Sequence, residues 1–394
     1  MMGRRLILCL DGTDNSPTSM AKDPQGNLEP VRTNVSRFFR MLDKSQTAQL
    51  AYYQPGVGTI DPERSSNRWD RMRNQMGRIY DSMVGWMIST HVMSAYRFLM
   101  NQYQPGDEIY LLGFSRGAFV ARVVAGMLHK VGLLYPGQEE TLPFAYQVYA
   151  PLENHDGANR FRQFYSRTVP IRFLGLWDTV SSVGNPFHMT VFPYTQNNPS
   201  VQTVRHAMAL DERRVMFRQN LWGDHPASGQ NVLQVWFPGV HADIGGGYTG
   251  DSSPGLAGIP LAWMIREART ALVQFDAAEE QRLLWPQSVT PPPVLSVEAV
   301  TDQYVTAEQH DEIRDHWHWR LVEQIPLPRS RMVGEHEWKR EFSRHRSAPR
   351  KLVSNQKTTQ TIRVHHSVDL RCQRCPQTYN PENLVPATVI SRVW

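Results

Sequence analysis

The chain has 394 residues, of which 41% are hydrophobic and 20% are charged. This balance is typical of a globular enzyme with a sizeable core and excludes an intrinsically disordered chain. The net charge is only +5, from 42 basic and 37 acidic residues. Such a small excess does not indicate nucleic-acid binding, and it is compatible with a mild preference for anionic surfaces such as lipid headgroups.

The N-terminal sequence does not resemble a targeting segment. The apolar run at residues 6–10 is too short for the core of a signal peptide, and Asp11 follows it at once. No stretch approaches the roughly 18 apolar residues that span a bilayer. We therefore expect a soluble protein made in the cytoplasm, whose export would need a route that reads no cleaved signal. Three cysteines are too few for a disulfide framework and are expected to be reduced.

Short apolar runs and helical patterns alternate along most of the chain. Strands are predicted at residues 6–10, 51–54, 109–112, 171–176 and 232–237, and helices at residues 78–103, 118–128, 204–217 and 260–275. Strands that alternate with helices favour an α/β fold with a mostly parallel sheet flanked by helices.

The segment at residues 135–170 is aromatic, polar and irregular, and we expect a helical insertion that forms a lid above the sheet. Residues 1–285 are expected to form the catalytic core. A proline-rich linker begins at Pro286, and residues 286–394 are expected to be an extension that packs on the core. Eight basic residues late in the chain are interpreted as a solvated face: Arg329, Arg331, Lys339, Arg340, Arg344, Arg346, Arg350 and Lys351.

The strongest local motif is Gly113-Phe114-Ser115-Arg116-Gly117. It lies between a predicted strand and a helix rich in small residues, which is the context of a nucleophile elbow in an α/β-hydrolase. The tight turn lifts the serine hydroxyl above the sheet, and the two glycines leave room where side chains would clash. We therefore predict Ser115 as a nucleophile, the alternative being an ordinary capping serine.

A serine hydroxyl needs a base, and the base needs an acid that orients it. In this fold the acid and then the histidine follow the serine along the chain, each just beyond a strand. Asp178 and His241 satisfy that order. Alternative roles are a helix cap for Asp178 and a turn residue for His241, and His206 and His366 are rival bases. Asp243 lies too close to His241 to orient its imidazole easily.

The oxyanion formed during ester cleavage needs two backbone N–H donors. One is expected from Arg116, the residue after the nucleophile. The other is expected from the turn after the first strand, at Gly12 or Thr13, where the glycine allows close backbone approach.

Two metal-based interpretations compete with this serine chemistry. A metal-dependent phosphatase or phosphodiesterase would use Asp11, Asp14, His241 and Asp243. The pair Cys372 and Cys375 lies near two histidines and superficially suggests zinc, but a closed zinc site needs four compatible ligands. We expect no metal and no cofactor.

Eight segments resemble one known family. They are LCLDGTDN at 8–15, YYQPGVGT at 52–59, GFSRGAFVAR at 113–122, GLWDTVSSVG at 175–184, HAMALDERR at 206–214, FPGVHADIGGGY at 237–248, HHSVDLR at 365–371 and YNPENL at 379–384. The chain thus resembles α/β-hydrolases with a domain of formerly unknown function, typified by the Tle1-type phospholipase effectors of type VI secretion.

This resemblance implies that Ser115, Asp178 and His241 form a catalytic triad with phospholipase or related carboxylesterase activity. The chain is shorter than the large effectors, which puts an antibacterial role in doubt, and no secretion or immunity partner can be named. The aromatic residues and the arginines Arg160, Arg162 and Arg167 of residues 135–170 suggest a surface for acyl chains and anionic headgroups at a membrane. A lipid ester is therefore the expected substrate, ahead of a soluble short-chain ester or a polymer ester.

Overall fold

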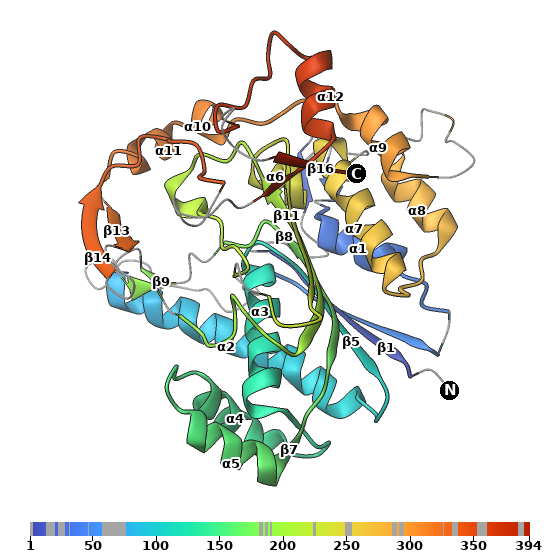
Figure 1. Cartoon of the computed structure of the whole chain (residues 1–394), viewed down its shortest axis with the longest axis vertical. Helices are drawn as coiled ribbons and strands as arrows, with labels where there is room; N and C mark the ends of the chain where they lie inside the picture. The colour runs from blue at the N-terminus through green and yellow to red at the C-terminus, as the bar shows by residue number, and fades with distance from the viewer. Residues whose placement is uncertain are drawn as a thin grey trace.

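A computed structural model of the chain shows a single large sheet covered by helices on both faces (Figure 1). It describes residues 3–12, 20–22, 28–30, 32–45, 47–56, 76–180, 184–185, 188–189, 191–223, 226–248, 254–285, 290, 295–325, 327–332, 338–352, 361–384 and 390–394. Within these residues, no helix is both long and apolar enough to cross a membrane.

Eight strands form the central sheet in the order β16-β15-β12-β11-β8-β5-β1-β4, and all neighbours run parallel. They are β1 (Arg5–Leu10), β4 (Gln49–Gln54), β5 (Glu108–Phe114), β8 (Ile171–Trp177), β11 (Val201–Ala209), β12 (Asn231–Phe237), β15 (Ile362–His365) and β16 (Ile390–Val393). The predicted parallel sheet of an α/β fold is confirmed. Because all strands run the same way, their carboxyl ends meet at one edge, where ligands bind in such sheets.

The two faces of the sheet bury separate clusters of apolar side chains. Along β1, Leu6 and Leu8 pack towards one cluster, whereas Ile7 and Cys9 pack towards the other. The first cluster lies under α2 (Met76–Gln102) and α3 (Arg116–Val131). The second lies under α1 (Asn34–Met41), α7 (Gly258–Thr270), α8 (Ala277–Leu284) and α9 (Val297–Tyr304).

The prediction of a helix at residues 204–217 is wrong. The segment forms strand β11 and, after a turn, a single 3-10 turn at Val215–Phe217. The strand lies between β8 and β12 and is buried on both sides over most of its length, so its apolar residues do not alternate. Val204, Ala207 and Met208 therefore have a spacing that imitates one face of a helix.

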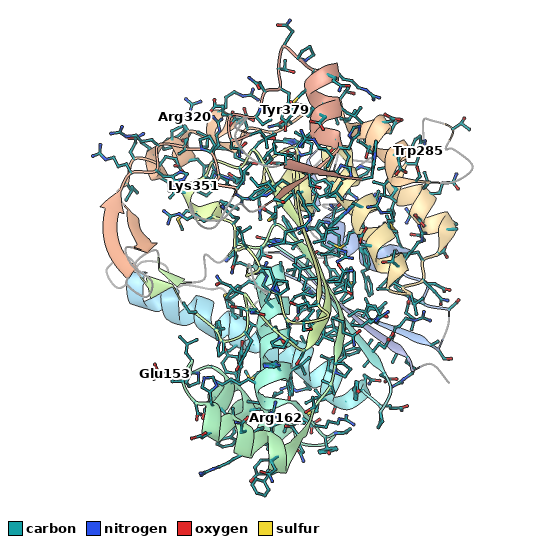
Figure 2. All side chains as sticks on the ribbon, in the orientation of Figure 1. Glu153, Arg162, Trp285, Arg320, Lys351 and Tyr379 are labelled. Atoms are coloured by element: carbon teal, nitrogen blue, oxygen red, sulfur yellow. The ribbon has the colours of Figure 1, made fainter. Side chains whose placement is uncertain are left out.

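The insertion at residues 135–170 is helical, as predicted, but it does not lie over the sheet edge that carries Ser115. It forms α4 (Leu142–Tyr149) and α5 (His155–Tyr165), and β6 (Leu133–Leu134) pairs with β7 (Ser166–Arg167) at its base. Because α3 starts beside Ser115 and is about 24 Å long, the chain leaves it at the amino-terminal edge of the sheet. The labelled Glu153 and Arg162 accordingly lie at the opposite end of the view from Lys351 (Figure 2). The expected lid position is wrong.

The region after residue 285 joins the core directly. β15 and β16 extend the central sheet beyond β12, and α12 (Ser367–Arg374) packs beside them. Between α9 and β15 the chain forms α10 (Glu312–Asp315), α11 (Trp317–Val322) and the hairpin of β13 (Leu327–Met332) and β14 (Trp338–Ser343), which arch over the upper left of Figure 1. The remaining short strands are β2 (Met20–Lys22), β3 (Leu28–Pro30), β9 (Gly184–Asn185) and β10 (His188–Met189). The division of the chain at residue 285 stays a prediction.

Candidate active site

Ser115 occupies a strained turn between β5 and α3. Its φ angle is +56°, in a region that non-glycine residues rarely adopt. A Cβ atom on Gly113 would lie 2.5 Å from the carbonyl oxygen of Gly117, and one on Gly117 would lie 2.2 Å from the carbonyl oxygen of Leu10. Both glycines of the motif are therefore required by the close approach of α3 to the ends of β5 and β1.

His241 lies at the start of α6 (His241–Gly245), directly after the loop that follows β12. Its Nε2 atom is 2.9 Å from the Ser115 hydroxyl oxygen. The imidazole ring contacts the rings of Phe114 and Phe217, with centroid separations of 4.7 Å and 4.8 Å. Because the two aromatic rings restrict its rotation, the imidazole is held facing the serine.

Asp178 follows β8 and completes the chain of hydrogen bonds. Its Oδ2 atom is 2.5 Å from His241 Nδ1, and its side chain is fully buried. Burial alone would raise the pKa of Asp178, but the Arg350 guanidinium and the hydrogen bond from His241 outweigh burial and hold that pKa below its ordinary value. Asp178 is therefore ionised and can orient the imidazole.

The three side chains meet because their strands are neighbours or next neighbours. β5 pairs with β8, and β11 separates β8 from β12. The backbone N–H of Ser115 donates to the carbonyl of Trp177, and the N–H of Asp178 donates to the carbonyl of Ala207. These bonds continue the ladder past the strand ends, so the predicted Ser115, Asp178 and His241 lie together at the carboxyl edge.

The sequence interpretation missed Arg350. Its guanidinium donates to both carboxylate oxygens of Asp178, at 2.6 Å from Nη1 and 3.0 Å from Nη2. Only 7% of Arg350 is exposed, so the expected solvated face does not include it. No local pattern identifies this pair, because 172 residues separate the two partners.

Glu212 is a second residue that the sequence did not single out for a role. Its carboxylate accepts a bond of 3.1 Å from the backbone N–H of His241 and forms an ion pair of 2.7 Å with Arg214. Arg214 in turn lies 3.7 Å from the ring centroid of Phe217. The acidic and basic residues of the segment DERR, at 211–214, were the available signal.

Two of the three expected oxyanion donors, Arg116 and Gly12, lie within the described residues. Arg116 begins α3, where a helix N-terminus favours negative charge. The N–H of Gly12 instead donates to the carboxylate of Asp11 at 2.6 Å. Thr13 lies outside the described residues. Burial raises the pKa of Asp11 to about 6, although bonds from Tyr53 and Thr33 oppose the increase.

The phosphatase alternative loses support because its described members have other partners. His241 uses both ring nitrogens for Ser115 and Asp178, and Asp243 bonds to His310 at 2.7 Å. Asp11 accepts bonds from Thr33 and Tyr53, and Asp14 lies outside the described residues. Within the described part of the chain, no three His, Cys, Asp or Glu side chains are arranged to hold a metal ion, and Cys372 and Cys375 are free.

The rival histidines lie elsewhere. His206 is buried within β11, and its Nε2 accepts the N–H of Thr179 at 3.2 Å. Burial lowers its pKa to about 3, and the guanidinium of Arg122 adds to this effect. His366 precedes α12, and its ring packs on Trp394. Neither ring bonds to Ser115 in the structure.

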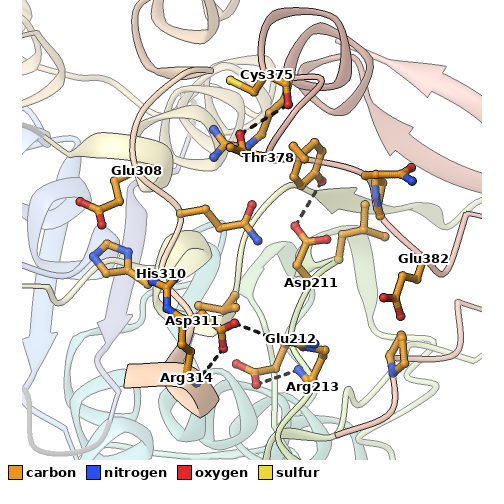
Figure 3. Close-up of a pocket in the computed structure, with 18 of the residues that line it drawn as sticks. Asp211, Glu212, Arg213, Glu308, His310, Asp311, Arg314, Cys375, Thr378 and Glu382 are labelled. Carbon is orange, nitrogen blue, oxygen red and sulfur yellow. Dashed lines mark hydrogen bonds and ion pairs between the residues drawn. The ribbon is translucent and has the colours of Figure 1, made fainter. Parts of the chain in front are cut away.

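A cavity of about 530 Å³ is lined in part by Val240, the residue before His241 (Figure 3). Glu212 lines it, and so do Asp211, Arg213, His310 and Arg371, whereas neither Ser115 nor His241 does. The labelled Arg213 and Asp311 are joined across it by an ion pair of 2.9 Å. This mixed-charge cavity is therefore separate from the serine.

Three comparisons identify relatives. The family model described as "T6SS, Phospholipase effector Tle1-like, catalytic domain" matches residues 4–267. The uncharacterized protein YEL023C of Saccharomyces cerevisiae is 38% identical over 232 residues, which are 55% of this chain and 32% of the yeast protein.

Two solved structures are more distant, each at 19% identity. An uncharacterized protein from Pseudomonas aeruginosa aligns with 76% of this chain and 48% of its own, at a TM-score of 0.43. The Tle1 effector bound to the VgrG spike of the type 6 secretion system aligns with 63% of this chain and 52% of its own, at a TM-score of 0.33. The chain spans about a third of the yeast relative and about half of each solved structure. On the family match, which covers most of its length, the chain belongs to the Tle1-like phospholipase effector family, in the region of its catalytic domain.

Proposed function

We propose that this chain is a serine hydrolase that cleaves carboxylic esters of lipids. The observation that carries the proposal is the continuous hydrogen-bond chain from the Ser115 hydroxyl through His241 to Asp178. It begins at a strained turn, which is the geometry that exposes a nucleophile above a sheet. Membership of a phospholipase effector family supports the same chemistry.

The reaction follows from the contacts of each group. His241 Nε2 takes the proton of Ser115 as its oxygen bonds to the ester carbonyl carbon, and Asp178 stabilises the resulting imidazolium. His241 then gives that proton to the leaving alcohol as the carbon–oxygen bond breaks. Water attacks the acyl-enzyme with His241 again as the base, which releases the carboxylic acid and restores the serine.

The tetrahedral intermediate carries a negative oxygen that needs N–H donors. We assign the first donor to Arg116, because it begins α3 immediately after the nucleophile. The second donor remains predicted for the loop of Gly12 and Thr13. Gly12 would have to exchange its bond with Asp11 for one with the substrate.

The lipid part of the proposal now depends on a surface other than the insertion. The exposed Phe144 and Phe164 of the insertion lie at the end of the sheet away from Ser115. On the other side, Trp319 of α11 contacts Phe217, which contacts His241.

Trp317 and Leu321 of the same helix are four residues apart, so they are neighbours on one face of it. Trp317 is 71% exposed and Leu321 is 58% exposed, and Ile325, past the helix end, is 51% exposed. Because Trp319 is two residues from each of the first two, it lies on the opposite face of the helix from them, and the exposed pair is suited to a lipid surface outside the site.

Intact-mass measurement after fluorophosphonate treatment tests the serine chemistry. The proposal requires one added phosphonyl group, mapped to Ser115, and no label on a folded Ser115→Ala variant. That variant should lose ester hydrolysis by about 10⁴-fold or more, because triad members act as a unit. Labelling that persists in Ser115→Ala, or activity that disappears with a chelator, would exclude the proposed mechanism.

A second measurement separates lipid esters from the alternative, a soluble short-chain carboxylesterase. Fatty-acid release from phospholipid vesicles is compared with hydrolysis of p-nitrophenyl esters of increasing chain length. The lipid proposal requires release from vesicles and a rise in kcat/KM with acyl length. Activity confined to acetyl and butyryl esters would leave only the serine chemistry.

A further inference from the structure

Arg350 reaches the triad from a part of the chain that the family match does not include. The match ends at residue 267, whereas Arg350 lies in the loop between β14 and β15. Besides its two bonds to Asp178, its guanidinium donates to the carbonyls of Ala209, at 3.0 Å, and Phe217. Its backbone carbonyl accepts a bond from Asn383. The loop is thus tied to β11, to Phe217 and to the C-terminal segment at the same point.

The hydrogen bonds from Arg350 and two neighbouring donors allow the Asp178 carboxylate only one orientation. Oδ1 accepts the N–H of Ala209 at 3.0 Å and Nη1 of Arg350, while Oδ2 accepts His241 Nδ1 and Nη2 of Arg350. Each oxygen therefore has two donors. A planar guanidinium that binds both oxygens also fixes the plane of the carboxylate, which a single point charge does not do.

Other charged groups near the histidine are compensated. Glu212, which bonds the His241 N–H, is paired with Arg214, and Arg214 is also paired with Glu312. Asp243, on α6, is bonded to His310. His206 interacts electrostatically with Asp178 from β11, but its lowered pKa keeps it neutral. These groups remain in place when Arg350 alone is changed.

We propose that Arg350 is a positioning residue of the triad, which fixes the Asp178 carboxylate through a two-point contact. The inference rests on the proposed serine mechanism, in which Asp178 orients the base. It gives the region after residue 285 a direct part in the reaction, although that region lies beyond the family's catalytic domain match.

Two substitutions separate the effect of the positive charge of Arg350 from the effect of its two-point contact with Asp178. Arg350→Met removes both, and Arg350→Lys keeps the charge but not the two-point contact. We expect kcat at the pH plateau to fall by about 10²-fold in Arg350→Met, as for a misplaced catalytic group, with KM changed by less than threefold. Arg350→Lys should also lose plateau activity, because a single ammonium group does not hold both oxygens of Asp178.

Arg371→Met is the matched control. Arg371 is also a buried arginine from the C-terminal region, and its guanidinium donates to the carbonyls of Val305 and Ala307 rather than to the triad. Its removal should lower the denaturant midpoint while kcat at the pH plateau is retained. In addition, guanidinium ion at millimolar concentration should partly restore the kcat of Arg350→Ala and should not change that of Arg371→Ala.

The outcomes distinguish this inference from the function on which it rests. If wild-type Ser115 takes no fluorophosphonate label, the proposed function fails. If the wild type is labelled and active, but Arg350→Lys and Arg350→Met both retain the wild-type kcat at the pH plateau, the positioning role is wrong. An equal loss of plateau kcat in Arg371→Met would also overturn it.

Discussion

Asp178→Asn tests whether the Asp178 carboxylate sets the tautomer and orientation of His241. Asparagine has one acceptor oxygen and must turn its NH₂ group towards one of the two oxygen sites. At the Oδ1 site the NH₂ would face two fixed donors, the N–H of Ala209 and Nη1 of Arg350. At the Oδ2 site it faces Nη2 of Arg350 and His241, and a neutral imidazole can change tautomer and accept.

With the NH₂ group at the Oδ2 site, one buried donor is left unpaired instead of two. Each unpaired donor costs about 1–3 kcal/mol of free energy. We therefore expect the asparagine to donate to His241 Nδ1, which forces the proton onto Nε2 and leaves no acceptor for the serine proton. The expected loss in kcat is about 10⁴-fold, or about 5 kcal/mol of barrier.

The assay is hydrolysis of a p-nitrophenyl ester together with the rate of fluorophosphonate labelling, which should fall in parallel. Asp243→Asn is the control, because this buried carboxylate lies two residues after His241 but bonds to His310 and to the N–H of Val240. It should remain within about tenfold of the wild type. Asp178→Asn with more than a tenth of wild-type kcat would refute the tautomer argument.

Three further predictions concern the base, the lipid surface and pH. His241→Ala should match the loss of Ser115→Ala in steady-state assays, whereas His206→Ala should be milder; the reverse order would mean that the wrong histidine was chosen. Leu321→Glu should lower fatty-acid release from vesicles about tenfold or more, because an exposed leucine that enters lipid contributes about 1.5–3 kcal/mol. Phe164→Glu, at the far end of the sheet, should not lower fatty-acid release. Neither variant should change the hydrolysis rate of a soluble ester. If both variants lowered fatty-acid release equally, the lipid surface would lie elsewhere. Burial raises the pKa of Asp211 to about 7, so the folded state binds its proton more tightly than the unfolded state. Stability from this group should be fully present below about pH 4 and be lost as the pH rises to about 7. Urea unfolding should therefore show Asp211→Asn to be more stable than the wild type at pH 8 but not at pH 4, and an equal difference at both pH values would contradict the shift.

The sequence was sufficient to predict which side chains come together where their positions depend on local pattern and strand order. Ser115 was found from its glycines, and Asp178 and His241 were found because each follows an apolar run in the order that the fold requires. The structure brings all three within hydrogen-bonding reach. Strand β11 was missed because burial over most of its length removes the alternation by which a strand is recognised.

The position of the insertion and the role of Arg350 required the tertiary structure. An insertion between α3 and β8 must leave from the amino-terminal edge of the sheet, because a crossover helix returns the chain there. Its aromatic composition contains no information about that edge. Arg350 stood in a run of basic residues, and composition alone assigns such a run to solvent. Only the packed loop shows that one member of the run is buried against Asp178.

The pairing of Asp178 with Arg350 also determines when during synthesis the site can be completed. The strand that carries the aspartate is made long before the loop that carries the arginine, because 172 residues separate the two partners. Until then Asp178 has no compensating guanidinium, and leaving one member of a buried charge pair unpaired costs about 3–5 kcal/mol. A nascent chain in which the turn of Ser115 had already formed would thus hold the Asp178 carboxylate without its ion-pair partner. For an enzyme proposed to cleave lipids, this order of events would delay full activity inside the producing cell until most of the chain has been made.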